Sequence, residues 1–159
     1  MNIHTTVWGL GNPLLKDDGA GLEVIRLLQE EAPKGFSLRS CELAPGNYLG
    51  TLAREQPQTF ILVDASDMGL PPGSVRRFPL SRIDSPTFTS HDLPLDELLE
   101  KALPPGCTAT VIAIQPESTD FFIGLSEPAA NAAKQVAALI AAGSTETIEL
   151  LEDDQGDTD

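Results

Sequence analysis

The chain contains few residues of several types. Only 2 of its 159 residues are cysteine, only 2 are histidine, and 5% are aromatic. Cys41 and Cys107 lie far apart without the spacing of a zinc site, which favours reduced core thiols over a disulfide. No apolar run approaches the roughly 20 residues of a membrane-spanning helix. The first residues lack the basic region and continuous apolar run of a secretory signal. We therefore expect a cytoplasmic protein with no membrane segment.

Positive charge is also scarce. Lys and Arg number 10 against 24 acidic residues, which gives a formal net charge of −14. Because nucleic-acid binding needs a basic surface, this composition excludes it. Residues 145–159 contain no base and a cluster of acids: Glu146, Glu149, Glu152, Asp153, Asp154, Asp157 and Asp159. We predict one domain over residues 1–143 and a flexible acidic tail over residues 144–159.

Apolar periodicity predicts alternating strands and helices. The expected strands cover residues 4–10, 36–42, 60–63, 74–78 and 108–114, and the expected helices cover residues 18–31, 48–54, 92–103 and 127–142. This alternation is typical of a three-layer α/β/α sandwich with a mostly parallel sheet of about five strands. The short strand with Arg76 and Arg77 suits an antiparallel edge.

In such sheets ligands bind at the carboxyl ends of the strands. Asp17 and Asp18 follow the first expected strand, Asp64 ends the third, and residues 115–117 follow the last. If the strands are parallel there, these side chains meet at one edge. Gln115 and Glu117 are the weaker candidates of this set.

The glycine-rich turn from Gly9 to Gly21 resembles a nucleotide-binding loop, but several of its residues argue against nucleotide binding. Leu14 occupies the third glycine position of the G-x-G-x-x-G fingerprint, and Pro13 removes one N–H donor. Two carboxylates at the start of a helix would also repel a phosphate. We interpret the turn as a device that presents a carboxylate to a cation.

Each candidate residue also has a structural explanation. Asp18 could be an N-cap or a first-turn acid of the following helix, and Asp64 could bind the N–H groups of the next loop. Because one acid is enough for the helix start, we interpret Asp17 as the cap or turn former and Asp18 as the ligand candidate. His91 could be a surface residue, although it lies at a loop–helix junction and His4 is the only other histidine. Two carboxylates and one imidazole suit a borderline divalent ion such as zinc or nickel and leave coordination positions open. We see no Ser–His or Cys–His arrangement for covalent catalysis.

Several blocks resemble the nickel–iron hydrogenase maturation proteases. The matching blocks are GLGNPLLKDDGAG at 9–21, ILVDASDMGLPPG at 61–73 and TSHDLPL at 89–95. APGN at 44–47 and AIQP at 113–116 are similar to the branch that serves formate-hydrogenlyase (hydrogenase 3) type enzymes. The resemblance covers residues 7–142, with the blocks in order.

The resemblance implies a cytoplasmic endopeptidase, an aspartic-type or metal-assisted hydrolase. It would remove the C-terminal extension of the hydrogenase large-subunit precursor after nickel insertion. Asp18, Asp64 and His91 would be its metal ligands and catalytic residues. Nickel would be bound with or through the precursor, and zinc or cadmium could substitute for it. We expect a monomer. The alternative is a non-proteolytic nickel-sensing or nickel-delivery factor for hydrogenase assembly.

Overall fold

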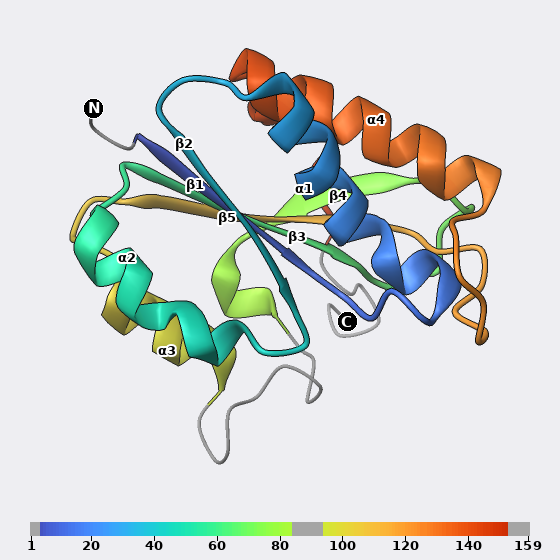
Figure 1. Ribbon diagram of the computed structural model, residues 1–159, viewed down its shortest axis with the longest axis horizontal. Helices are drawn as coiled ribbons and strands as arrows, with labels where there is room; N and C mark the ends of the chain where they lie inside the picture. The colour runs from blue at the N-terminus through green and yellow to red at the C-terminus, as the bar shows by residue number, and fades with distance from the viewer. Residues whose placement is uncertain (1–3, 84–93, 153–159) are drawn as a thin grey trace, which may run out of the picture.

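The computed structural model describes residues 4–83 and 94–152. Its strands form one five-stranded sheet in the order β2-β1-β3-β5-β4 (Figure 1). The strands are β1 (Thr5–Leu10), β2 (Phe36–Glu42), β3 (Thr59–Ala65), β4 (Val75–Phe78) and β5 (Thr108–Ile114). Only β4 runs antiparallel to its neighbour, β5; the other pairs are parallel. The predicted mostly parallel sheet with one antiparallel edge strand is confirmed.

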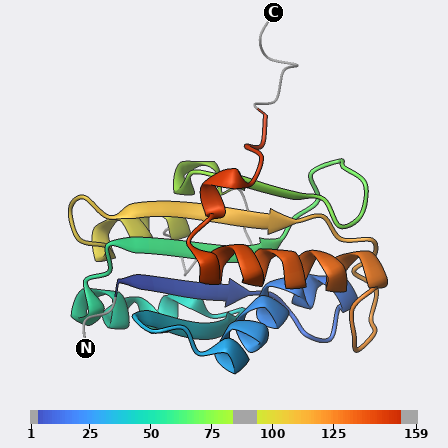
Figure 2. The ribbon, with the colours of Figure 1, turned by 90° about the horizontal axis from the view of Figure 1, so that it is seen from above.

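Helices cover both faces of this sheet. They are α1 (Ala20–Glu31), α2 (Leu49–Glu55), α3 (Leu95–Ala102) and α4 (Glu127–Ala142), with short 3-10 turns η1 (Lys16–Gly19), η2 (Pro45–Tyr48), η3 (Leu80–Arg82) and η5 (Thr145–Thr147). Figures 1 and 2 show α1 and α4 on one face and α2 and α3 on the other, which confirms the three-layer sandwich. No helix in the described part of the chain is long and apolar enough to span a membrane.

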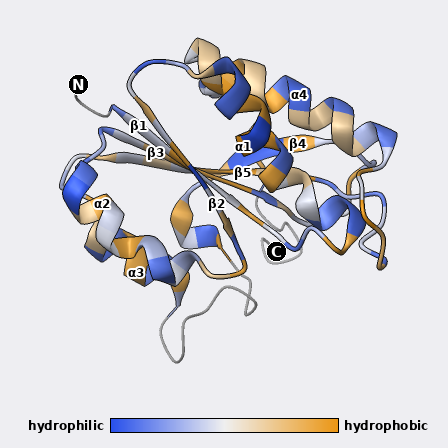
Figure 3. Cartoon of the chain, viewed as in Figure 1, coloured by the Kyte–Doolittle hydropathy of each residue, from blue (hydrophilic) through white to orange (hydrophobic). Residues whose placement is uncertain are grey.

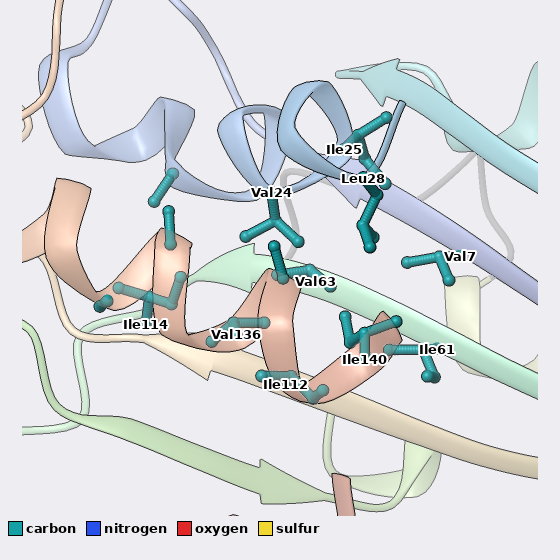
Figure 4. Packing of buried hydrophobic residues seen from close by; sticks show 14 of the residues in the cluster. Val7, Val24, Ile25, Leu28, Ile61, Val63, Ile112, Ile114, Val136 and Ile140 are labelled. Carbon is teal, nitrogen blue, oxygen red and sulfur yellow. The ribbon is translucent and has the colours of Figure 1, made fainter. Parts of the chain in front are cut away.

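Alternation along the strands sends neighbouring residues to opposite faces. Val7, Ile61 and Ile112 pack under α1 and α4, in the cluster drawn in Figure 4. Trp8 and Leu62, each one residue further along, pack under α2 and α3. The central strands are therefore apolar on both sides, as expected for a parallel sheet covered by helices. In Figure 3, each helix carries both hydrophobic and hydrophilic residues.

The predicted element boundaries differ from the structure mainly at the starts of helices. The helix expected from residue 18 begins as η1 and becomes α-helical at Ala20, and α3 begins at Leu95. Ser126 caps α4 as predicted, since its Oγ accepts a hydrogen bond from Ala129 N–H at 3.4 Å. Pro128 lies in the first turn of that helix, where a missing N–H costs nothing.

The first part of the expected flexible tail is packed on the sheet. Ile148 is buried, Arg77 N–H donates to Glu149 O at 3.0 Å, and Leu151 N–H donates to Arg77 O at 2.9 Å. The Arg77 side chain adds a bond from Nε to Ile148 O at 2.7 Å. This segment therefore differs from the prediction: the unpaired edge of β4 supplies backbone partners that acidic composition does not reveal. Residues 153–159 lie outside the described part.

Glycine permits a very close approach of α1 to the ends of β1 and β3. A Cβ on Gly21 would collide with the carbonyl oxygen of Val63 and come within 2.7 Å of that of Leu10. A Cβ on Gly9 would lie 2.5 Å from the Gly21 oxygen. Backbone atoms surround Gly21, so no side chain can move aside. This contact holds the segment after β1 against the end of β3.

We predict that Gly21→Ala lowers the free energy of unfolding by about 3 kcal/mol, because the added methyl group must push apart the backbones of two strands. Urea denaturation measures the change. Gly50→Ala is the matched control: Gly50 is exposed in α2, and a Cβ added there would meet only Arg54 Nη1 at 3.8 Å. That substitution should stabilise the protein by about 0.5 kcal/mol. An unchanged urea midpoint for Gly21→Ala would contradict the prediction.

Candidate active site at the carboxyl edge of the sheet

The strand order places a topological switch point between β1 and β3. The chain leaves β1 for β2 on one side, and β3 lies on the other side. At such a point the loops after the two strands diverge and leave a crevice at the carboxyl edge. Asp18 lies in η1, directly after β1, and Asp64 is the penultimate residue of β3. The structure thus brings these two predicted site residues to the same edge.

Asp18 is held by the turn and does not cap a helix. Its Oδ2 accepts a hydrogen bond from Asn12 N–H at 2.7 Å. Neither η1 nor α1 has a side-chain N-cap bond. Gly11, at φ 143°, passes so close to the Asp18 carbonyl oxygen that any Cβ there would collide with it. The capping interpretation of Asp18 is therefore wrong, and the glycine turn serves to position this carboxylate.

Asp64 is a carboxylate with one oxygen left unsatisfied. Strand alternation places it on the α2/α3 face, like Phe60 and Leu62. Its Oδ1 is buried and has no hydrogen-bond partner among residues 4–83 and 94–152. Burial, and then the negative charge of Asp18, raise the pKa of Asp64 well above its usual range, although a bond from Ala65 N–H opposes the shift. A negative charge on Asp18 therefore disfavours a negative charge on Asp64.

This unsatisfied acceptor fits a cation. Buried polar atoms are nearly always bonded, so each exception needs an explanation. Two other buried side-chain atoms in the described residues also lack partners, Trp8 Nε1 and Arg39 Nε, but both are donors. Of these three atoms, only Asp64 Oδ1 can bind a positive ion. A metal ion between Asp18 and Asp64 would satisfy that oxygen and cancel the repulsion between the carboxylates.

The third predicted ligand, His91, lies outside the described residues, so its position stays a prediction. Within residues 4–83 and 94–152, no group of three His, Cys, Asp or Glu side chains could hold a metal ion. The helix α3, which begins four residues after His91, packs its Leu95 and Leu99 on the same sheet face as Asp64.

Asp17 has a structural role that the sequence did not reveal. It is fully buried, and its carboxylate accepts bonds from Ser126 N–H at 2.7 Å, Ser126 Oγ–H at 2.6 Å and Glu117 N–H at 2.9 Å. Ser118 N–H contributes a longer contact of 3.5 Å, and Asp17 N–H donates to Ser118 O at 3.1 Å. Asp17 therefore anchors the loop between β5 and α4, about 100 residues later. We predicted only a local cap or turn former.

These bonds also set the charge state of Asp17. Burial alone would raise its pKa, but the bonds from Ser126, Glu117 and Ser118 outweigh burial and lower the pKa. Asp17 and Asp18 are adjacent in sequence, yet the first is saturated with donors inside the protein. The second faces the crevice with one described hydrogen bond.

Gln115 is a further site residue that we ranked low. It is buried, and its Oε1 accepts bonds from Met68 N–H at 2.6 Å and Leu70 N–H at 3.3 Å. Its Nε2 donates to Asp67 Oδ1 at 3.2 Å and to Pro116 O at 3.3 Å. Gln115 thus ties the loop after β3 to the loop after β5. A buried amide directly after an apolar strand was the signal for this role.

Asp67 forms the turn that we expected of it. It accepts a bond from Gly69 N–H at 3.1 Å. The bond from Gln115, followed by the one from Gly69, lowers the pKa of Asp67.

A cleft of about 290 Å³ opens between these loops. It is lined by Asp18, Ala65, Ser66, Asp67, Gln115, Pro116, Glu117, Ser118 and Thr119. Its walls carry three carboxylates from three separate segments. The cleft is therefore an acidic recess beside the Asp18–Asp64 pair, suited to a cation or to a chain segment that carries one.

Fold and site together define an α/β protein with an acidic crevice at its switch point. Residues 43–143 match the HycI family, described as hydrogenase maturation protease. The Hydrogenase 3 maturation protease of Escherichia coli K12 is 31% identical over 132 residues, which span 80% of this chain and 82% of that protein. The chain belongs to the hydrogenase maturation protease family.

Solved structures agree with this assignment. The [NiFe] hydrogenase maturation protease HycI from Thermococcus kodakarensis KOD1 has a TM-score of 0.76 and 26% identity, over 89% of this chain and 92% of that one. A structure of a Hydrogenase 3 Maturation protease has a TM-score of 0.80 at 22% identity, over 95% and 98% of the two chains. The second likeness concerns the fold. The family and branch that the sequence blocks resemble are confirmed.

We predict that Asp17→Asn lowers the free energy of unfolding by about 3 kcal/mol at neutral pH, because an amide NH₂ would face buried donors. The loss should shrink as pH falls below 3.8, since the lowered pKa makes this stabilisation present above that value and absent once the carboxylate is protonated. Urea denaturation at several pH values measures it. Asp120→Asn, an exposed acid of the same loop, is the control. Equal losses at both positions would contradict the prediction.

Asp64→Asn should have the opposite effect on stability. Because the pKa of Asp64 is raised, its ionised form destabilises the metal-free protein increasingly as pH rises from 3.8 toward the raised value. Each unit of elevation corresponds to about 1.4 kcal/mol. With a chelator present, we expect Asp64→Asn to melt at a higher temperature than the wild type at pH 7 and at a similar temperature near pH 4. A lower melting temperature at pH 7 would refute this.

Proposed function

We propose that this chain is an endopeptidase that removes the C-terminal extension from the large-subunit precursor of a nickel–iron hydrogenase once nickel has been inserted. Membership in the hydrogenase maturation protease family supports the reaction class. The name of the E. coli relative supports a hydrogenase 3 type of substrate. The observation that carries the proposal is the buried, unpaired Oδ1 of Asp64 beside the carboxylate of Asp18.

In this proposal the metal belongs to the substrate. Asp18, Asp64 and His91 would bind nickel that the precursor already holds, so that only a loaded precursor completes the site. Zinc or cadmium would replace nickel at such a ligand set. A bound divalent ion supplies positive charge that polarises a carbonyl group and lowers the pKa of a bound water molecule. These chemistries match a metal-assisted hydrolase.

The protein contributes a fixed geometry to this reaction. Asn12 N–H holds one oxygen of Asp18 at 2.7 Å, which leaves the other oxygen available. Asp64 pairs with Ala113 of β5 in the register of the sheet, so its backbone cannot shift. The raised pKa of Asp64 also allows the carboxylate pair to share a proton, as in aspartic-type catalysis. The pair can therefore bind a cation or retain a proton at the same position.

Cysteine chemistry does not compete with this mechanism. Burial raises the pKa of the Cys41 thiol to about 12, although Arg39 opposes the shift. Burial also raises the pKa of Cys107, which directly precedes β5 at the opposite edge of the sheet. Both thiols are protonated at neutral pH and would be poor nucleophiles. A covalent acyl-enzyme on cysteine is therefore not part of the proposal.

Mass spectrometry of the precursor tests the proposed reaction. We expect the purified protein to shorten the nickel-loaded large-subunit precursor from the same genome and to leave the nickel-free precursor intact. Asp18→Asn, Asp64→Asn and His91→Ala should each slow trimming about 100-fold or more, because each removes a proposed metal ligand. Glu31→Gln, an exposed acid at the far end of α1 and outside the ligand set, should trim at the wild-type rate.

The alternative assembly factor predicts a different result. A nickel-sensing or nickel-delivery protein would bind the loaded precursor without changing its mass. An intact precursor after prolonged incubation, with complex formation detected, would replace the endopeptidase proposal with this alternative. Trimming by all three ligand variants at the normal rate would instead move the active site elsewhere.

A further inference from the structure

Four large apolar side chains lie exposed beside the candidate site. Leu14, Phe121, Phe122 and Ile123 are 46%, 79%, 56% and 76% exposed. They form four of the six large hydrophobic side chains exposed in the described part of the chain. We call these four residues the apolar ridge. An exposed apolar patch on a soluble domain typically marks an interaction surface.

The backbone holds the ridge firmly in place. Phe122 N–H donates to Leu14 O at 2.9 Å, and Lys16 N–H donates to Phe122 O at 2.8 Å. Lys16 adopts φ 47°, a left-handed conformation that a side-chain-bearing residue seldom takes. Its Nζ lies 5.7 Å from the centre of the Phe122 ring and 3.7 Å from Glu117 Oε1. In Figure 2 the loop before α4 lies beside the segment that follows β1.

The buried side chain of Asp17 also holds the loop that carries Phe121, Phe122 and Ile123. Its bonds to Glu117, Ser118 and Ser126 hold both ends of the loop that carries the ridge. Contact of these aromatic and aliphatic side chains with water is unfavourable. The hydrogen bonds to Asp17 hold the loop in place despite this cost. The fold therefore presents hydrophobic side chains to solvent on a fixed loop.

The ridge is continuous with the candidate site. Residues 116–119 line the cleft beside Asp18, and the ridge residues 121–123 follow immediately. Leu14 lies four residues before Asp18, which also lines the cleft. A folded body whose nickel reached Asp18 and Asp64 would lie against the ridge. A peptide short enough to fit within the cleft would not need it.

We infer that the apolar ridge is the docking surface for the folded body of the large-subunit precursor, an inference that depends on the proposed function. The matching patch on the precursor is an apolar depression with basic side chains at its border. This charge complements Glu117, Asp67 and Asp120, the acids exposed around the cleft and ridge, on a chain of net charge −14. The ridge supplies binding energy at a distance from the cleaved bond, and the carboxylate pair supplies the chemistry.

Steady-state trimming of the nickel-loaded precursor tests this assignment. The test variant is Phe121→Ser/Ile123→Ser, and the matched control is Leu43→Ser/Leu150→Ser, which changes the two exposed apolar side chains outside the ridge. We expect the test variant to raise KM at least tenfold with kcat within twofold of wild type, because binding common to ground and transition states is lost. The control should match wild type. Asp120→Lys should raise KM by severalfold through charge repulsion.

The outcomes separate this inference from the proposed function. If the wild type trims the precursor and the test variant keeps a normal KM, the ridge is not a docking surface and the proposed function stands. The same conclusion follows if only kcat falls. If the wild type does not trim, the proposed function fails, and direct binding of the same variants to the loaded precursor decides the inference. Equal binding by test and control variants, or no binding by the wild type, overturns it. If the double variant melts at a lower temperature, Phe121→Ser alone replaces it.

Discussion

The geometry at the carboxyl edge of the sheet depends on the hydrogen bonds to the buried carboxylate of Asp17. This carboxylate gathers N–H and O–H donors from Glu117, Ser118 and Ser126 around one side chain. A charge inside a protein is tolerable only when hydrogen bonds replace its lost hydration. Because those donors come from the β5–α4 loop, this requirement fixes the loop against η1. The position of Asp18, the cleft wall and the exposed Phe122 all follow from that attachment.

Two adjacent aspartates thus have opposite surroundings: Asp17 stabilises the fold, and Asp18 is the proposed ligand. Asp17 is saturated with donors, and its pKa is lowered despite burial. Asp18 has one described hydrogen bond and repels Asp64, whose buried Oδ1 has no partner within the described part of the chain. The repulsion between Asp18 and Asp64 destabilises the fold, and the hydrogen bonds to Asp17 offset that cost. An unsatisfied buried acceptor of this kind is consistent with the proposed metal site.

Prediction from sequence worked best where local rules act alone. The strands over Phe36–Glu42 and Thr108–Ile114 and the helix ending at Ala142 have the predicted limits, since apolar periodicity and capping residues lie within each segment. The edge placement of Asp18 and Asp64 followed from topology. The packing of Ile148 against β4 did not, because a free strand edge is not visible in the composition of the segment that covers it. His91 remains a predicted ligand.

By itself, the sequence determined the alternation of elements, the acidic character and the motif blocks that assign the family. These are properties of neighbouring residues, readable from spacing and chemistry. Only the tertiary structure decided that Asp17 anchors a loop about 100 positions away, how Gln115 joins two loops, and that Leu14 and Phe122 meet across a similar separation. Those outcomes depend on burial and on donors supplied from elsewhere in the fold, which no local pattern encodes. The two adjacent aspartates look alike in sequence and differ only in what surrounds them.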